Sequence, residues 1–137
     1  LGFRHVTGVK QWEPQEKASF IAHLIDGRDY SYDATSKLIG SKPETVRRNY
    51  IAFHLLNAFE ELIESDSASE ALERARDDFS VFFLSLREEG IREFLGISLE
   101  MLPADVRKGI GQLDREKVES FLVWMFGTDE VDAFIGE

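Results

Sequence analysis

The stretch SYDATSKLIGSKPETVRRNYIAFHLLN, residues 31–57, decides the fold of this chain, because it predicts two helices joined at a glycine. Gly40 can adopt the left-handed conformation that a tight turn between helices needs. Val46 is then placed to pack back on Leu38, and the polar residues at the start of the second helix stay free to face a groove. This pattern is typical of a helix-turn-helix, so DNA binding is the first hypothesis.

Each of the two helices has a start signal. Ser31 can cap the first, which is expected to run through about Ile39. Residues 41–44, SKPE, have the S-x-x-E form of a capping box, with a proline in the first turn of the second helix. Apolar residues then recur at helical spacing, at Val46, Tyr50 and Phe53. Since nothing breaks the pattern before Asp66, this helix is expected to run on, or to kink near Asn57.

A further helix is expected before this pair. Pro14 fits a first turn, and the DGRD segment at residues 26–29 ends the helix. Its apolar stripe consists of Ala18, Ile21, Leu24 and Ile25. Residues 1–11 have no helical period, and the chain begins at Leu1 rather than methionine. We therefore interpret residues 1–11 as a connector from a missing upstream domain, and residues 12–65 as the helix-turn-helix module.

Residues 66–137 are predicted to form a second, acidic, all-helical part. Ser67 to Glu70 has the form of another capping box and is expected to open a long helix that Gly90 closes. Its buried side would contain Leu72, Ala75, Phe79, Phe82, Phe83 and Leu86. A short apolar piece, Ile91–Leu95, and a turn-rich segment with a helical turn after Pro103 follow.

The end of the chain predicts two more helices. Asp114 is expected to cap one that contains Val118 and an almost unbroken apolar run over residues 121–126, so this helix should be buried on most sides. Thr128 is expected to cap a last short helix with Val131, Phe134 and Ile135. No strand alternation is present, and the sequence therefore predicts an all-α fold: a helix-turn-helix module followed by an acidic, bundle-like half.

The charge is distributed unevenly along the 137 residues, whose net charge is −10. Residues 1–57 carry eight basic and six acidic side chains, a net of +2, and residues 58–137 carry eight basic and twenty acidic ones, a net of −12. A strongly acidic surface disfavours contact with phosphates, so only the first part suits nucleic acid. The split suggests two jobs in one chain, with the acidic half mediating assembly as a homodimer or binding another protein partner.

Several locations and chemistries are excluded by the composition. No apolar run approaches the roughly 20 residues of a membrane-spanning helix, and no secretion signal precedes Trp12. The absence of cysteine excludes disulfides and sulfur-based zinc sites. We expect a cytoplasmic protein with no membrane partner. His5, His23 and His54 lie far apart with no metal-ligand spacing, and no catalytic triad or phosphate loop is recognisable, so no enzymatic activity, cofactor or metal is expected of this fragment.

The segment from about Val9 to Asn57 resembles the central DNA-binding segment of ParB-type partition proteins and their KorB-like relatives. The matching residues are WEPQEKASFIAHLIDG, residues 12–27, and SYDATSKLIGSKPETVRRNY, residues 31–50. The match contains one extra residue between Val46 and Tyr50, and RHVTGVKQW replaces an acidic, asparagine-rich motif of that family. The resemblance implies a DNA-binding module in segregation, transcriptional control or a mobile-element system, cut from a longer protein. It assigns no nucleotide to these residues.

If DNA is the ligand, the residues around the turn are the candidates for contact. The first residues of a recognition helix enter the major groove, and arginine pairs well with guanine and asparagine with adenine. The candidates are Lys37, Ser41, Lys42, Thr45, Arg47, Arg48 and Asn49. Arg47 and Arg48 point about 100° apart on a helix, so one is expected to read bases and the other to hold phosphate. The alternative is a protein-interaction module in which the helix-turn-helix is only a scaffold and the acidic half is the partner surface.

Overall fold

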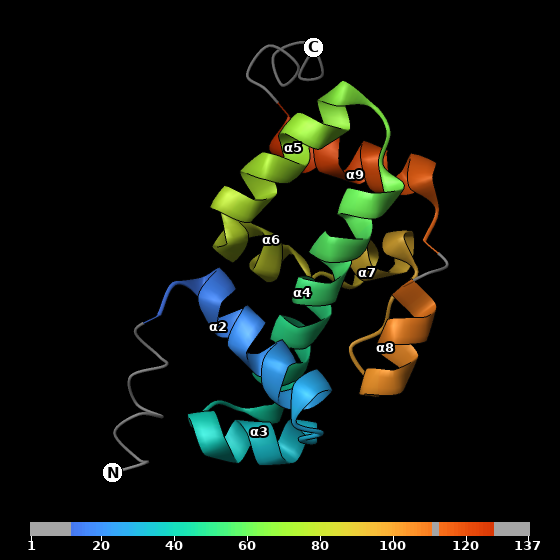
Figure 1. The fold of residues 1–137 in the computed structure, drawn as a ribbon. Helices are drawn as coiled ribbons and strands as arrows, with labels where there is room; N and C mark the ends of the chain where they lie inside the picture. The colour runs from blue at the N-terminus through green and yellow to red at the C-terminus, as the bar shows by residue number, and fades with distance from the viewer. Residues whose placement is uncertain (1–11, 111–112, 128–137) are drawn as a thin grey trace.

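The computed structural model describes residues 12–110 and 113–127, and these residues contain helices and no strand, so the predicted all-α fold is confirmed. The elements are α2 (Pro14–Ala22), the π-helical segment η1 (His23–Gly27), α3 (Tyr32–Ile39), α4 (Pro43–Leu62), α5 (Asp66–Asp77), α6 (Phe79–Ser85), α7 (Glu89–Leu95), α8 (Pro103–Gly109) and α9 (Arg115–Phe126). In Figure 1, α4 runs through the middle of the molecule, α2 lies alongside it, and α3 crosses its lower end.

The predicted turn between α3 and α4 is present. The Ser31 hydroxyl accepts a hydrogen bond from the Ala34 backbone N–H at 3.0 Å and so caps α3. Gly40 ends α3 in the left-handed conformation, with φ 74°. The backbone N–H groups of Gly40 and Ser41 both donate to the Ser36 carbonyl, at 2.9 and 3.1 Å, which closes the helix end. The glycine therefore has the role that the sequence predicts.

The capping box predicted at Ser41 does not form, and α4 begins one residue later than that box requires. Lys42 is the N-cap of α4 and has extended backbone angles, and no side chain caps this helix start. The cause is Pro43, because a residue before proline is pushed out of the helical region, whereas a box at Ser41 would need Lys42 to be helical. From Pro43 the helix continues without a break to Leu62, which is the longer of the two predicted forms.

The acidic half departs from the prediction at both ends of its first helix. The cap of α5 is Ser65, whose hydroxyl accepts from the Ala68 N–H at 3.1 Å, and the predicted box at Ser67 does not form. The Glu119 carboxylate of α9 fixes this corner by accepting from the backbone N–H groups of Glu64 and Ser65, at 2.6 and 3.1 Å. A contact with a residue far along the chain therefore sets the helix start.

The single long helix predicted up to Gly90 is also wrong. The backbone turns at Asp78, with φ −116° and ψ 53°, and divides the segment into α5 and α6. This turn allows Phe82 to contact Phe59 and Phe121, with ring centroids 6.0 and 6.3 Å apart. Gly90 lies inside α7, and Gly96, with φ 79°, ends that helix.

The last described helix is less buried than its apolar run predicts. The Asp114 side chain accepts from the Glu116 N–H at 3.1 Å, so the predicted cap is confirmed. Trp124 is 61% exposed, however, because α9 covers the core from one side only. The predicted connector at residues 1–11 and the last helix beginning at Thr128 lie outside the described residues.

One hydrophobic core joins the two predicted parts. Buried residues from α2, α3 and α4 belong to the same cluster as those from α5 to α9, and Phe59 and Phe82 are both fully buried within it. The boundary expected near Asp66 therefore separates no second core in the part of the chain that the structure describes. Over the same residues, no helix combines the length and the apolar character required to cross a membrane.

Candidate nucleic-acid interface

The amino-terminal turn of α4 is open to solvent. Lys42 and Glu44 are exposed, and Ser41 and Thr45 are half-buried. Lys37, near the end of α3, is exposed as well. Five residues around the turn are thus accessible to a ligand, and one of them, Glu44, carries a negative charge that phosphate would avoid.

Arg47 and Arg48, in the second turn of α4, lie against aromatic rings on two different sides of the helix. The Arg47 guanidinium carbon is 5.4 Å from the centre of the Tyr32 ring of α3, and that of Arg48 is 4.6 Å from the Phe83 ring of α6. Both distances are within the range of about 6 Å in which a cation is attracted to an aromatic face. The two side chains therefore point in different directions, and the expectation that one reads bases while the other holds phosphate stays a prediction.

Asn49 is not accessible, and the prediction that it contacts DNA does not fit this geometry. Its side chain is 4% exposed, and its Nδ2 donates to the Thr45 carbonyl of the preceding turn at 2.9 Å. The residue lies on the side of α4 that packs into the protein, so the amide is already satisfied within its own helix.

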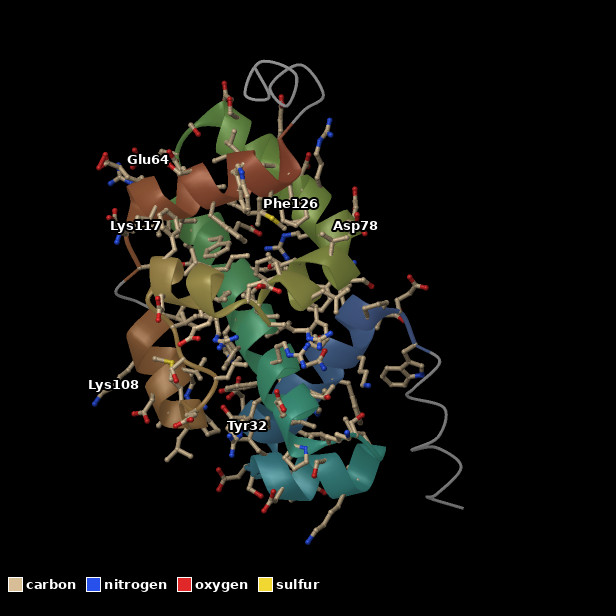
Figure 2. The ribbon with its side chains drawn as sticks, turned by 180° about the vertical axis from the view of Figure 1, so that it is seen from behind. Tyr32, Glu64, Asp78, Lys108, Lys117 and Phe126 are labelled. Carbon is tan, nitrogen blue, oxygen red and sulfur yellow. The ribbon has the colours of Figure 1, made fainter. Side chains whose placement is uncertain are left out.

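Three further arginines lie near Arg47 or Arg48, and they are not predicted as site residues from the sequence. Burial lowers the pKa of Arg48, and the positive charges of Arg87 and Arg92 lower it further, so these side chains share one region. Arg47 and Arg107 both act on the ionisation of Tyr32 and thus lie around its ring. We call Arg47, Arg48, Arg87, Arg92 and Arg107 the arginine cluster. In Figure 2, α6 and α7 lie in front of α4 and α8 lies to one side of it, with Tyr32 lower in the view.

Most of the cluster forms no ion pair, although the charge of the Glu44 carboxylate acts on Arg48 and opposes the lowering of its pKa. Among the described residues, Arg47, Arg48, Arg87 and Arg92 form no ion pair, and the buried Nε atoms of Arg47 and Arg48 have no hydrogen-bond partner. Arg92 donates to the Leu86 carbonyl at 2.8 Å, which fixes its direction without cancelling its charge. Unpaired, partly buried positive charge raises the energy of the free protein, and an anion would relieve it.

Arg107 differs from the rest of the cluster because it belongs to a closed polar network. Its Nη1 donates to Asp26 Oδ1 at 2.6 Å and to the Tyr50 hydroxyl at 2.9 Å. The Tyr50 hydroxyl donates to Asp26 Oδ1 at 2.6 Å, and His54 Nε2 lies 2.7 Å from Asp26 Oδ2. Asp26 is in the π-helical η1, so this network ties α8 to η1 and α4.

The ionisation of this network follows from its bonds. Burial by itself would raise the pKa of Asp26, but hydrogen bonds from Tyr50, His54 and Arg107 outweigh it, and the pKa is lowered from 3.8. Burial raises the pKa of Tyr32 to about 12, and burial together with the Asp26 carboxylate raises that of Tyr50. Both phenols are therefore neutral at physiological pH. No group of acidic or histidine side chains in residues 12–110 and 113–127 is arranged to hold a metal ion.

In comparisons with known proteins, no family model, no curated protein and no solved structure matches this chain. The ParB-like resemblance of residues 9–57 therefore stays a prediction.

Proposed function

We propose that this chain binds double-stranded DNA, with the open first turn of α4 directed into the major groove. The unpaired members of the arginine cluster, Arg47, Arg48, Arg87 and Arg92, would contact the phosphates beside it. The observation that carries the proposal is the gathering of unpaired arginines next to a helix-turn-helix in a protein of net charge −10. Clustered basic groups supply most of the affinity of a DNA-binding protein, because they release counterions from the duplex.

The roles of the residues follow from their exposure. Ser41, Lys42 and Thr45 are accessible at the helix start, where side chains and backbone amides reach base edges and phosphates. Lys37 adds a cation from the end of α3. The aromatic rings hold Arg47 and Arg48 in fixed directions, so less side-chain freedom is lost when a phosphate binds. Sequence-specific recognition would then rest on a short stretch of α4.

The experiment is a binding titration by fluorescence anisotropy with labelled short duplexes whose centre is randomised. The Arg47→Ala/Arg48→Ala double variant should lose most of the binding while its circular dichroism spectrum stays helical. Arg74→Ala is the matched control, because Arg74 is an exposed arginine of α5 outside the cluster. Equal binding by the double variant and the wild type would refute the proposal.

A second candidate function, protein–protein association, is favoured by the exposed aromatic residues of the acidic half. Trp124 is 61% exposed and Phe94 is 43% exposed, and both line an apolar cavity of about 300 Å³ between α7 and α9. The occupant we propose is a second copy of this chain, since one short α4 turn reads few base pairs and paired half-sites require a dimer. The homodimer expected through residues 66–137 would therefore form at the surface around Trp124 and Phe94.

The association is tested by sedimentation. The wild type should sediment as a dimer in a concentration-dependent manner, and Trp124→Ser should shift the equilibrium towards the monomer without unfolding the chain. A monomer at every concentration, or a dimer that Trp124→Ser leaves intact, would exclude this surface.

A further inference from the structure

A cavity lies on the side of α4 that carries Phe53, Leu56 and Asn57, away from Arg47 and Arg48. It has a volume of about 830 Å³ and is lined by residues of α2, of the middle of α4, and of the α5–α6 corner. A volume of this size is typical of binding sites for small organic molecules, which are pockets of roughly 300–1,000 Å³.

Aromatic rings form the walls of this cavity. They come from separate parts of the chain: Trp12 before α2, Phe20 within α2, Phe53 on α4 and Phe79 at the start of α6. The Trp12 and Phe20 rings meet edge to face, with centroids 5.2 Å apart and planes at 71°. Trp12 remains 42% exposed, whereas Phe79 is 4% exposed, so the indole is accessible and the Phe79 ring is fixed in the core. A flat ring bound in the cavity would cover the open indole face.

The uncharged polar groups of the cavity are available for hydrogen bonds. The side chains of Gln15, Ser19 and Asn57 line it and have no hydrogen-bond partner in the described part of the chain. The Arg76 charge is neutralised, since Nη2 donates to Glu60 Oε1 at 2.5 Å. Glu16 and the exposed His23 also line the cavity, and Glu16 Oε1 accepts from the Glu13 backbone N–H at 3.3 Å, which fixes its direction without cancelling its charge. The carboxylate disfavours an anionic ligand, and none of the described residues that line the cavity is an unpaired arginine or lysine.

We infer that this cavity binds an uncharged, flat heteroaromatic molecule of the size of a purine nucleoside. Its rings would stack against Trp12 and the phenylalanines, and its amide-like edges would bond to Asn57 and Gln15, which each offer a donor and an acceptor. The inference goes beyond DNA binding and does not depend on it, because the cavity and the arginine cluster use different faces of α4.

The experiment follows the emission of Trp12 in the Trp124→Phe variant, which leaves Trp12 as the one remaining tryptophan. Adenosine and inosine are the uncharged probes, and choline and benzoate are the charged ones. Adenosine should change the emission of Trp12 in a saturable manner, and choline and benzoate should bind more weakly. Asn57→Ala in the same background should weaken adenosine binding by about tenfold, which corresponds to one lost hydrogen bond.

The control variant is Ser69→Ala, because Ser69 is an exposed polar residue of α5 outside the cavity, and it should bind adenosine like the parent. The inference is overturned if neither uncharged probe gives a saturable change, if a charged probe binds more tightly, or if Asn57→Ala binds adenosine as well as the parent does. Binding of DNA by the same variants reports separately on the proposed function.

Discussion

The two sets of arginines beside α4 are in opposite environments. Arg107 has a carboxylate and a phenol within hydrogen-bond distance, and the hydrogen bond with Tyr50 raises its pKa despite some burial. Arg48 has an aromatic ring on one side and two further arginines near it, and burial followed by these charges lowers its pKa. One arginine stabilises the fold, whereas the other is held at some cost to it.

The contrast between Arg107 and Arg48 distinguishes an arginine whose charge stabilises the fold from one whose charge is available to a ligand. A paired arginine has little left to offer a phosphate, because its donors are used and its charge is neutralised. An unpaired and partly desolvated arginine gains a partner when an anion arrives. We therefore assign Arg47 and Arg48 to DNA binding, and Arg107 to the attachment of α8. Mutation of these residues tests each assignment.

The largest expected effect is on DNA affinity. Arg47→Ala/Arg48→Ala should weaken binding by roughly 100-fold or more, because each arginine contact with DNA contributes about 1–3 kcal/mol. Fluorescence anisotropy at fixed salt measures the change. Arg107→Ala, which removes the paired arginine, should weaken binding far less, and a loss as large as that of the double variant would remove the distinction between the two environments.

A smaller effect, on stability, is expected at the polar network. Asp26→Ala should lower the free energy of unfolding by roughly 2 kcal/mol, since it leaves the Tyr50 hydroxyl, Arg107 and His54 without their shared acceptor. Urea denaturation followed by circular dichroism measures it. Glu73→Ala, at an exposed position of α5, is the control and should change stability by less than about 0.5 kcal/mol. A similar value for both variants would show that the network contributes nothing.

The same network predicts a dependence of stability on acid. The folded-state pKa of Asp26 is lowered from 3.8, so the unfolded chain takes up this proton first as the pH falls. The contribution of Asp26 is therefore complete above its ordinary pKa and is lost as the pH falls below 3.8 through the folded-state value. The free energy of unfolding of Asp26→Asn should fall less steeply in that range than that of the wild type. Parallel pH profiles would contradict the assignment.

The smallest expected effect is a difference in the free energy of unfolding between two single arginine variants. Arg107→Gln should destabilise the fold by about 1 kcal/mol through lost hydrogen bonds, discounted because the side chain is 48% exposed. Arg48→Gln should leave stability within about 0.5 kcal/mol of the wild type, since no ion pair is lost. Thermal denaturation orders the two variants, and a greater loss for Arg48→Gln would reverse the comparison.

Local signals in the sequence were sufficient for the elements whose ends are set by neighbouring residues. Gly40 and the caps at Ser31 and Asp114 act within a few residues of the chain, and the structure confirms them. The cap at Ser65 and the break at Asp78 depend on Glu119 and on distant phenylalanine rings, which no local pattern contains.

The candidate site divides in the same way. Arg47 and Arg48 follow from the helix-turn-helix spacing, but Arg87 and Arg92 lie in a run with Glu88, Glu89 and Glu93 that is acidic in the sequence. The turn at Asp78, the packing of α6 on α4 and that of α7 on α9 bring the two arginines near Arg48. The burial of Asn49, by contrast, could be predicted, because it lies three residues after Val46 and four before Phe53, on the face of α4 that carries the apolar stripe.

The most direct test of the central claim is the salt dependence of DNA binding by Arg87→Ala. Arg87 is exposed and has no part in the core, so its loss should leave the fold intact. If the arginine cluster binds phosphates, the slope of log Kd against log salt should be steep for the wild type and smaller by about one for Arg87→Ala, with Arg74→Ala unchanged. Binding that does not respond to salt, or equal slopes for Arg87→Ala and Arg74→Ala, would contradict it.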